Sequence, residues 1–145
     1  MNATALRGAT AQDGAAIRAL LEANALPTSD LDEAQAEFIV AYDGSRLIGC
    51  AGIQRFDKTA LVRSVAVRED QRGSGLGRLL MFALERYARG AGVTDLVLLT
   101  QTAKPFFERQ RYHAIERASV PPAVQQSEEF RSLCPQSAAC LSKTL

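Results

Sequence analysis

The stretch Gln71-Arg-Gly-Ser-Gly-Leu-Gly-Arg-Leu-Leu80 places three glycines within five positions, directly before an apolar pattern with helical spacing. Such a loop gives up side chains, so backbone N–H groups can approach a bound group closely. A glycine-rich turn that opens a helix is an anion site, because the first N–H groups lack partners and the helix dipole adds about half a positive charge. Arg72 and Arg78 add full charges. The stretch therefore predicts a loop that holds a phosphate.

Two common phosphate motifs do not fit this loop. A dinucleotide fingerprint, G-x-G-x-x-G, needs a third glycine at a position held here by Arg78 or Leu80. A P-loop needs Lys followed by Ser or Thr after its last glycine, and here Arg-Leu follows. What remains is R-x-x-G-x-G, formed by Arg72, Gly75 and Gly77.

Composition limits the class of protein. The chain has 145 residues, 47% of them apolar, which is enough for a single domain over residues 1–145 with a hydrophobic core. The formal net charge is +1 and no basic block is visible, so we expect no nucleic-acid partner. No apolar run approaches the ~20 residues of a transmembrane helix, so we expect no membrane partner.

The N-terminus and the cysteines predict a cytoplasmic protein. The opening residues MNATALRGATAQDG lack the charged start and apolar centre of a signal peptide. The three cysteines, Cys50, Cys134 and Cys140, form no C-x-x-C pair, which is typical of free thiols in a reducing compartment. The spacing of Cys134 and Cys140 is not that of zinc ligands, and we expect no metal.

Hydrophobic periodicity predicts strands and helices interleaved around a mixed sheet. A hairpin over 37–56 is expected, because two β-rich runs flank Asp43-Gly44, a favoured tight turn. The helix after the glycine loop runs from about Leu76 to Arg89, with a buried stripe of Leu76, Leu79, Leu80, Ala83, Leu84 and Tyr87. The other expected strands are 4–9, 60–67, 94–101, 112–118 and 137–145, and the other expected helices are 10–26, 29–35, 103–111 and one opened by Pro121-Pro122.

The glycine loop resembles the pyrophosphate-binding signature Q/R-x-x-G-x-G/A of the GNAT acyltransferase superfamily, with a preceding strand that ends in Val-Ala-Val and an amphipathic helix behind it. The hairpin at 37–56 and the run Leu-Val-Leu-Leu-Thr100 fit other strands of that family. The segment TQTAKPFFERQRY resembles its later N-x-x-A-x-x-x-Y-x-x-x-G-F motif. The resemblance implies an α/β (α+β) GNAT fold: a mixed, mostly antiparallel central sheet, flanked by helices and splayed at the acyl-CoA site.

The resemblance also implies acetyl-CoA as cosubstrate. The strand Val65, Ala66 and Val67 would pair with the pantetheine arm, and a backbone N–H, with Val65 as the candidate, would face the thioester oxygen. Such a donor is worth on the order of 3 kcal/mol when it is aimed at developing charge. Phe106 and Phe107 are expected in the core. The resemblance also places Phe107 at the thioester pocket, and it counts Thr100, where the family often has Asn, among the acetyl-CoA-binding residues. The pyrophosphate would be held by Arg72, Gly73, Ser74, Gly75, Leu76, Gly77 and Arg78.

Two departures from the family leave the general acid and base unassigned. Phe107 stands where many members have a Tyr that protonates the leaving thiolate, and Phe has no proton to give. Many relatives carry a Glu a few residues before the Val-Ala-Val strand, where this chain has Arg63 and Ser64. A water relay, or an amine that is already neutral, would need no such residue.

Other titratable residues have weaker claims. Glu37, Asp57 and Glu69 lie near predicted strand ends, but carboxylates in such places are usually solvated surface charges. His113 is the only histidine and lies in a predicted strand, where a structural or exposed role is favoured over catalysis. Cys50 lies in an apolar strand and reads as a small buried hydrophobe.

The C-terminal run resembles the tail of the arsenic-resistance N-acetyltransferase subfamily, whose members tend to end with Leu-Cys-Pro-x-Ser-Ala. Trivalent arsenic prefers thiolates, as soft metals do, so Cys134 and Cys140 are the candidate ligands. Cys134 precedes Pro135 and is expected in an extended turn, and buried thiols resist becoming thiolates. We therefore expect both cysteines to be structural.

The sequence predicts an N-acetyltransferase that moves an acetyl group from acetyl-CoA to the amine of a small molecule, with a link to arsenic resistance suggested by the tail. The alternative is a non-catalytic module that binds acyl-CoA or an arsenical as a sensor. Phe107 and the missing Glu favour the alternative, whereas the intact loop fits both. Superfamily members often dimerise, so the resemblance is compatible with a homodimer.

Overall fold

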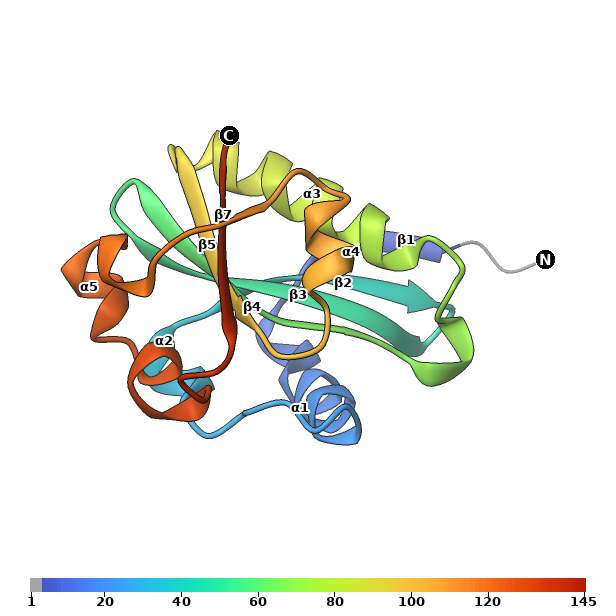
Figure 1. Cartoon of the computed structure of the whole chain (residues 1–145). Helices are drawn as coiled ribbons and strands as arrows, with labels where there is room; N and C mark the ends of the chain where they lie inside the picture. The colour runs from blue at the N-terminus through green and yellow to red at the C-terminus, as the bar shows by residue number, and fades with distance from the viewer. Residues whose placement is uncertain (1–3) are drawn as a thin grey trace.

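The computed structural model describes residues 4–145, which form a seven-stranded sheet with the order β1-β2-β3-β4-β5-β7-β6 (Figure 1). All neighbouring strands are antiparallel except β4 and β5, which are parallel. This is the expected mixed, mostly antiparallel sheet. The strands are β1 (Thr4–Gly8), β2 (Glu37–Asp43), β3 (Arg46–Phe56), β4 (Thr59–Val67), β5 (Asp95–Thr100), β6 (His113–Ala114) and β7 (Ala139–Thr144).

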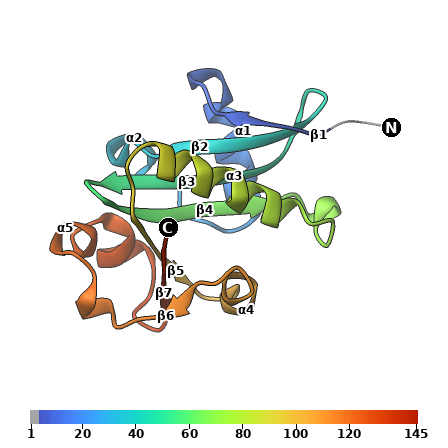
Figure 2. The same ribbon diagram turned by 90° about the horizontal axis from the view of Figure 1, so that it is seen from above.

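Helices cover both faces of the sheet (Figures 1 and 2). On one face, α3 lies across β2, β3 and β4 and shares a core with Phe107 of α4. On the other face, α1 packs against Val40 and Cys50, while α5 and the segment after it pack against Leu61 and Val97. The helices are α1 (Gly14–Ala23), α2 (Leu31–Ala34), α3 (Leu76–Gly90), α4 (Lys104–Glu108) and α5 (Pro122–Gln125), with short helical turns η1 (Ala11–Asp13), η2 (Glu69–Gln71), η3 (Arg117–Ser119) and η4 (Glu129–Leu133).

The predicted hairpin over 37–56 is confirmed, but its turn is shifted by one residue. Asp43 still pairs with Arg46, so the two central residues are Gly44 and Ser45 rather than Asp43 and Gly44. Gly44 has φ +61°, a conformation that glycine adopts without strain. The sequence located the turn correctly, while strand pairing decided which residues occupy its corners.

The buried stripe of α3 is only partly as predicted. Leu76, Leu80 and Leu84 face the sheet, but Leu79 and Tyr87 are 54% and 41% exposed. Their places in the interior are taken by Met81, Glu85 and Ala88. Glu85 is buried because the Tyr112 hydroxyl and the Lys143 ammonium both donate hydrogen bonds to it, at 2.9 and 2.8 Å. Hydrophobicity alone cannot predict a buried carboxylate whose partners lie far away in the sequence.

The C-terminal third departs most from the expected elements. The strand predicted over 112–118 is only two residues long, and the strand predicted over 137–145 is confirmed as β7, which lies between β5 and β6. Helices elsewhere in the chain are also shorter than predicted. The 10–26 segment forms η1 and α1, the 29–35 segment forms α2, and the 103–111 segment forms α4. The short helix at Pro121-Pro122 is confirmed as α5, whereas η4 was not predicted.

Candidate functional site

The sheet opens between β4 and β5. These parallel strands pair only at Thr59–Leu61 with Asp95–Val97, and beyond that point β5 continues its pairing with β7 alone. The rest of β4, residues 62–67, therefore has no hydrogen-bonded neighbour on its β5 side. A cleft of about 1920 Å³ opens here, lined by β4, the glycine loop, α4 and the segment around η4. This is the predicted splay of the sheet.

A bulge in β4 accompanies the opening. The pairing of β3 with β4 shifts between Cys50 and Gly52, and Ser64 at this point has φ +56°, which is uncommon for a residue with a side chain. The Cys50 thiol donates a hydrogen bond of 3.4 Å to the Ser64 carbonyl oxygen. Bulges often lie next to active sites, because they redirect a strand and end its pairing. Val65, Ala66 and Val67 follow the bulge and line the cleft.

The glycine loop forms one end of the cleft, here called the loop end (Arg72–Arg78). Gly73 and Gly75 have φ values of +80° and +86°, and Gly75 is the residue that caps the N-terminus of α3. A Cβ atom on either would meet nothing within 4 Å, so these glycines leave open space above a helix N-terminus. The Ser74 hydroxyl is turned back onto the Gln71 carbonyl oxygen at 2.6 Å. The geometry is that of an anion site.

Gly77 has a different reason to be glycine. A Cβ atom there would lie 3.1 Å from the ring of Phe106 on α4, so the absent side chain lets α4 pack closely against α3. The two glycines of the R-x-x-G-x-G pattern thus act separately. Gly75 shapes the loop, and Gly77 admits a neighbouring helix.

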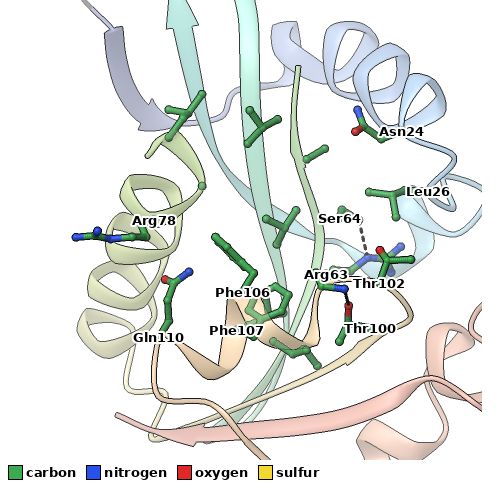
Figure 3. Close-up of a pocket in the computed structure, with 18 of the residues that line it drawn as sticks. Asn24, Leu26, Arg63, Ser64, Arg78, Thr100, Thr102, Phe106, Phe107 and Gln110 are labelled. Atoms are coloured by element: carbon green, nitrogen blue, oxygen red, sulfur yellow. Dashed lines mark hydrogen bonds between the residues drawn. The ribbon is translucent and has the colours of Figure 1, made fainter. Parts of the chain in front are cut away.

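The two arginines of the loop end differ as well. The Arg72 guanidinium donates a hydrogen bond to the side-chain oxygen of Asn24, which caps the C-terminus of α1. Arg78 is exposed and extends from α3 beside the cleft (Figure 3). Arg72 therefore ties the loop to α1, while the Arg78 guanidinium is accessible from solvent.

Phe106 and Phe107 form the middle of the cleft wall, between Arg78 and Arg63 (Figure 3). Phe107 is 6% exposed and makes edge-to-face contacts with Phe106 and Tyr112, with ring centroids 5.0 and 5.6 Å apart. Thr100 also lines the cleft, and its hydroxyl accepts a 3.0 Å hydrogen bond from the Ala103 N–H just before α4. Both residues implied by the resemblance are in the cleft, and Phe107 also belongs to the core.

The opposite end of the cleft carries buried charge and is here called the charged end (Arg63, Asp30 and Glu129). The Arg63 side chain is fully buried and donates to both carboxylate oxygens of Asp30, at 2.6 and 2.7 Å. Its Nε donates to the Ser64 hydroxyl at 3.1 Å, and Oε1 of Glu129 lies 3.8 Å from the same Nε. Arg63 and Glu129 line the cleft.

Glu129 is an unusual carboxylate. Its residue is 5% exposed, and burial is the main reason that its pKa rises to about 7; Arg63 opposes the rise and Asp30 adds to it. A carboxyl group whose pKa is raised by burial and that lines a cleft is a candidate for proton transfer. The sequence analysis missed Glu129, because it lies in an irregular segment and its partners Arg63 and Asp30 are distant in the sequence.

The three carboxylates considered from the sequence lie elsewhere. None of Glu37, Asp57 and Glu69 lines the cleft. Glu37 instead pairs with Arg55 at 2.5 Å and accepts a hydrogen bond from Tyr87, whereas Asp57 and Glu69 are exposed. His113 is exposed too. These residues fit the ordinary surface roles that the sequence analysis favoured.

All three cysteines are free thiols. Burial raises the pKa of Cys50 to about 12 and that of Cys134 to about 11, and it also raises the pKa of Cys140. Cys134 lines the charged end of the cleft, whereas Cys140 belongs to β7 and packs in the core with Leu61 and Val97. Over residues 4–145, no group of three or more metal-ligating side chains comes together, and no helix is long and apolar enough to cross a membrane.

A splayed sheet with a glycine loop at the opening is the architecture of acyltransferases that use a thioester donor. The sequence matches the acetyltransferase (GNAT) family over residues 11–112, so the chain belongs to this family. It is 31% identical to an uncharacterized N-acetyltransferase of Chlorobaculum tepidum over 94% of this chain and 91% of that protein.

Two further similarities concern a curated enzyme and a solved structure. The chain is 28% identical to an amino-acid acetyltransferase of Pasteurella multocida over 64% of this chain, which is 21% of that protein. Its fold matches that of Rv2747 from Mycobacterium tuberculosis, solved in complex with CoA and NLQ, with a TM-score of 0.82, 25% identity and 97% and 99% of the two chains covered.

Proposed function

We propose that this protein transfers the acetyl group of acetyl-CoA to the amine of a small, amino-acid-like molecule. The observation that carries the proposal is the unpaired edge of β4 directly beside a glycine loop at a helix N-terminus. An unpaired strand edge offers backbone groups to the pantetheine arm, and the helix N-terminus offers N–H groups to the pyrophosphate.

The loop end would hold the pyrophosphate of acetyl-CoA. Gly73 and Gly75 leave open space there, and Leu76 and Gly77 begin the helix, so their N–H groups are among those without intrahelical partners. Arg78 adds a charge that reaches solvent. Arg72 would act mainly by holding the loop in place through Asn24.

The strand after the bulge would position the thioester. Val65, Ala66 and Val67 are the free-edge residues nearest the loop, and a backbone N–H at Val65 would polarise the acetyl carbonyl. Most of the rate would come from holding the amine beside the thioester carbon. Phe107 provides an apolar wall without a proton donor, so the leaving thiolate would take its proton from the amine or from water.

The acceptor would enter at the charged end. This end of the cleft is lined by the buried Arg63 and Glu129 and by the half-buried Cys134, and such an enclosed lining suits a small molecule better than a protein segment. The acetylation of an amino acid by the Pasteurella relative supports the same class of acceptor. An arsenic-containing amine is the second candidate, supported by the tail resemblance and by the Cys134 thiol at this end of the cleft.

Turnover with a panel of amines tests the proposal. The protein is mixed with acetyl-CoA and individual L-amino acids, primary alkylamines or amino-acid arsenicals, and released CoA thiol is measured. We expect release with at least one amino-acid-like amine. Tight CoA binding without release for any amine would favour the non-catalytic sensor.

Gly75→Val tests the loop assignment, with Gly44→Val as its control. Both glycines have positive φ and open space around them, so both variants carry similar backbone strain of about 1–3 kcal/mol. Only Gly75→Val places a side chain at the loop end, and we expect CoA affinity in calorimetry to fall at least ~10-fold in that variant alone. Unchanged affinity in folded Gly75→Val would reject the loop as the pyrophosphate site.

A further inference from the structure

We infer that Glu129, supplied by the C-terminal segment, takes the proton from the incoming ammonium group of the acceptor. The inference rests on the proposed function. Many family members carry a glutamate on the strand that corresponds to β4, and this chain lacks it there. The geometry of the charged end supports it. Arg63 lies in the part of β4 that lacks the family glutamate, and the carboxylate of Glu129, from the distant η4, lies beside it in the cleft.

The hydrogen bonds of the charged end leave the Glu129 carboxylate without a donor from the described part of the chain. Asp30 occupies both terminal nitrogens of Arg63, and the Ser64 hydroxyl occupies Nε. Glu129 remains 3.8 Å from Nε, too far for a hydrogen bond. Within residues 4–145 no hydrogen bond to its carboxylate oxygens is formed, and these oxygens are not among the fully buried polar atoms that lack a partner, so they face the cleft that Glu129 lines. A carboxylate that faces the cleft with no donor from these residues can accept hydrogen bonds from an ammonium group bound there.

The charged end also carries an excess of negative charge. With all groups ionised, Arg63 contributes one positive charge and Asp30 and Glu129 two negative charges, which leaves one negative charge in excess. Since Asp30 and Arg63 neutralise each other in a bidentate pair, Glu129 carries that excess. A primary amine enters as a cation at neutral pH, and its charge balances this site.

The surroundings tune the carboxyl group for proton transfer. The charged or titratable groups that face it are Arg63 from β4, Asp30 before α2 and Cys134 after η4, while Arg117 of η3 stacks on the neighbouring Phe130. Burial dominates and raises the pKa of Glu129 to about 7. A group that titrates near the working pH is an effective acceptor and releaser of protons.

The proton balance is simple. An N–H bond of the ammonium breaks and its proton passes to a Glu129 oxygen, which frees the nitrogen lone pair. The nitrogen attacks the thioester carbon, a C–N bond forms, and the C–S bond breaks with its electron pair on sulfur. The second nitrogen proton passes to the CoA thiolate, and Glu129 returns its own proton to solvent through the cleft. No oxidant, reductant or metal takes part.

The test compares Glu129→Gln with Glu128→Gln, using two kinds of acceptor. Glu128 is the adjacent exposed glutamate, which contacts Ser132 and Arg131 on the surface. With a cationic acceptor from the panel, we expect kcat/KM at pH 7 to fall ~10²-fold or more in Glu129→Gln and to remain unchanged in Glu128→Gln. The wild-type inflection near pH 7 should disappear in Glu129→Gln, whose rate should recover as pH approaches the pKa of the amine itself.

A neutral acceptor separates chemistry from structure. Methoxyamine is unprotonated at pH 7, so its acetylation should proceed equally in the wild type and in Glu129→Gln. If Glu129→Gln does not fold, the wild type alone decides: an inflection near pH 7 with the cationic amine and none with methoxyamine supports the inference.

The outcomes are distinct. If Glu129→Gln turns over at the wild-type rate with the wild-type pH profile, the role of Glu129 is overturned and the proposed function still stands. Equal losses with cationic and neutral acceptors show a structural role and also overturn the inference. Wild type that binds CoA but acetylates no amine rejects the proposed function, and the inference with it.

Discussion

The two ends of the cleft are built on opposite principles. The loop end is exposed, and its ligand-facing groups come from the backbone: two glycines at positive φ and a helix N-terminus. Its side chains point to solvent or hold the loop in place. The charged end is buried and consists of side chains: Arg63, Asp30 and Glu129, joined across three separate segments of the chain. The loop end suits pyrophosphate, a group that is the same in every acyl-CoA. The side chains of the charged end suit one particular acceptor.

The difference also predicts how each end tolerates change. Backbone sites lose function through backbone strain or through a side chain that fills the ligand space, with a limited effect on folding. A buried charge cluster loses stability when the removed group is the hydrogen-bonded partner of an opposite charge, because that charge is left without compensation.

Asp30→Ala should cause the largest loss of stability. It leaves the fully buried Arg63 guanidinium without its bidentate partner, and breaking such a pair costs about 3–5 kcal/mol. Asp32→Ala is the matched control, because the Asp32 side chain is 89% exposed and its pair with Arg18 should contribute about 0–1 kcal/mol. Urea denaturation measures both. Equal losses in the two variants would mean that the charged end is not a buried cluster.

Phe107 lies in the cleft wall between the two ends, and two substitutions there test its contribution to stability and its role in catalysis separately. Phe107→Ala should lower the free energy of unfolding by roughly 3–5 kcal/mol, because it removes a buried ring packed on Phe106 and Tyr112. Phe107→Tyr should keep or raise acetyl-CoA turnover, since the hydroxyl adds a proton donor where the family often has one. A stable Phe107→Ala protein without activity would instead assign this ring a direct catalytic role.

Glu129→Gln should change the pH dependence of stability. Because the pKa of Glu129 is raised from 4.5 to about 7, the folded chain holds a proton that the unfolded chain releases in this interval. The wild type therefore loses stability as pH rises from about 4.5 to about 7, by on the order of 3 kcal/mol at most. Glu129→Gln lacks this loss, so it should be the more stable protein at pH 8 and equal to wild type at pH 4. Thermal melts at both pH values check the sign.

The cysteines should have the smallest effect. The double variant Cys134→Ser, Cys140→Ser should leave CoA affinity intact, because only Cys134 lines the cleft, and it does so at the charged end. The raised pKa values of both thiols also disfavour thiolate formation. Titration with phenylarsine oxide while free thiols are counted is the check. Stoichiometric loss of two thiols in the wild type, absent in the double variant, would favour an arsenical sensor.

The loop end could be predicted from sequence because its parts are contiguous. Strand, glycine loop and helix lie within β4 to α3, and positive φ at Gly73 and Gly75 follows from a local requirement that only glycine meets easily. The charged end could not be predicted in this way. Its residues are separated by tens of positions, and η4 has no periodic pattern that would place Glu129 inside.

The strand–loop–helix unit, the hairpin and the mixed sheet could be predicted because periodicity and turn chemistry act between near neighbours in the sequence. The burial of Glu85 in α3, the packing role of Gly77 and the position of β7 inside the sheet depend on contacts that form only in the folded chain. The same holds for the cluster of Asp30, Arg63 and Glu129. The physical reason is that a buried charge is tolerated only beside its partner, and partners from distant segments meet only when the chain has folded.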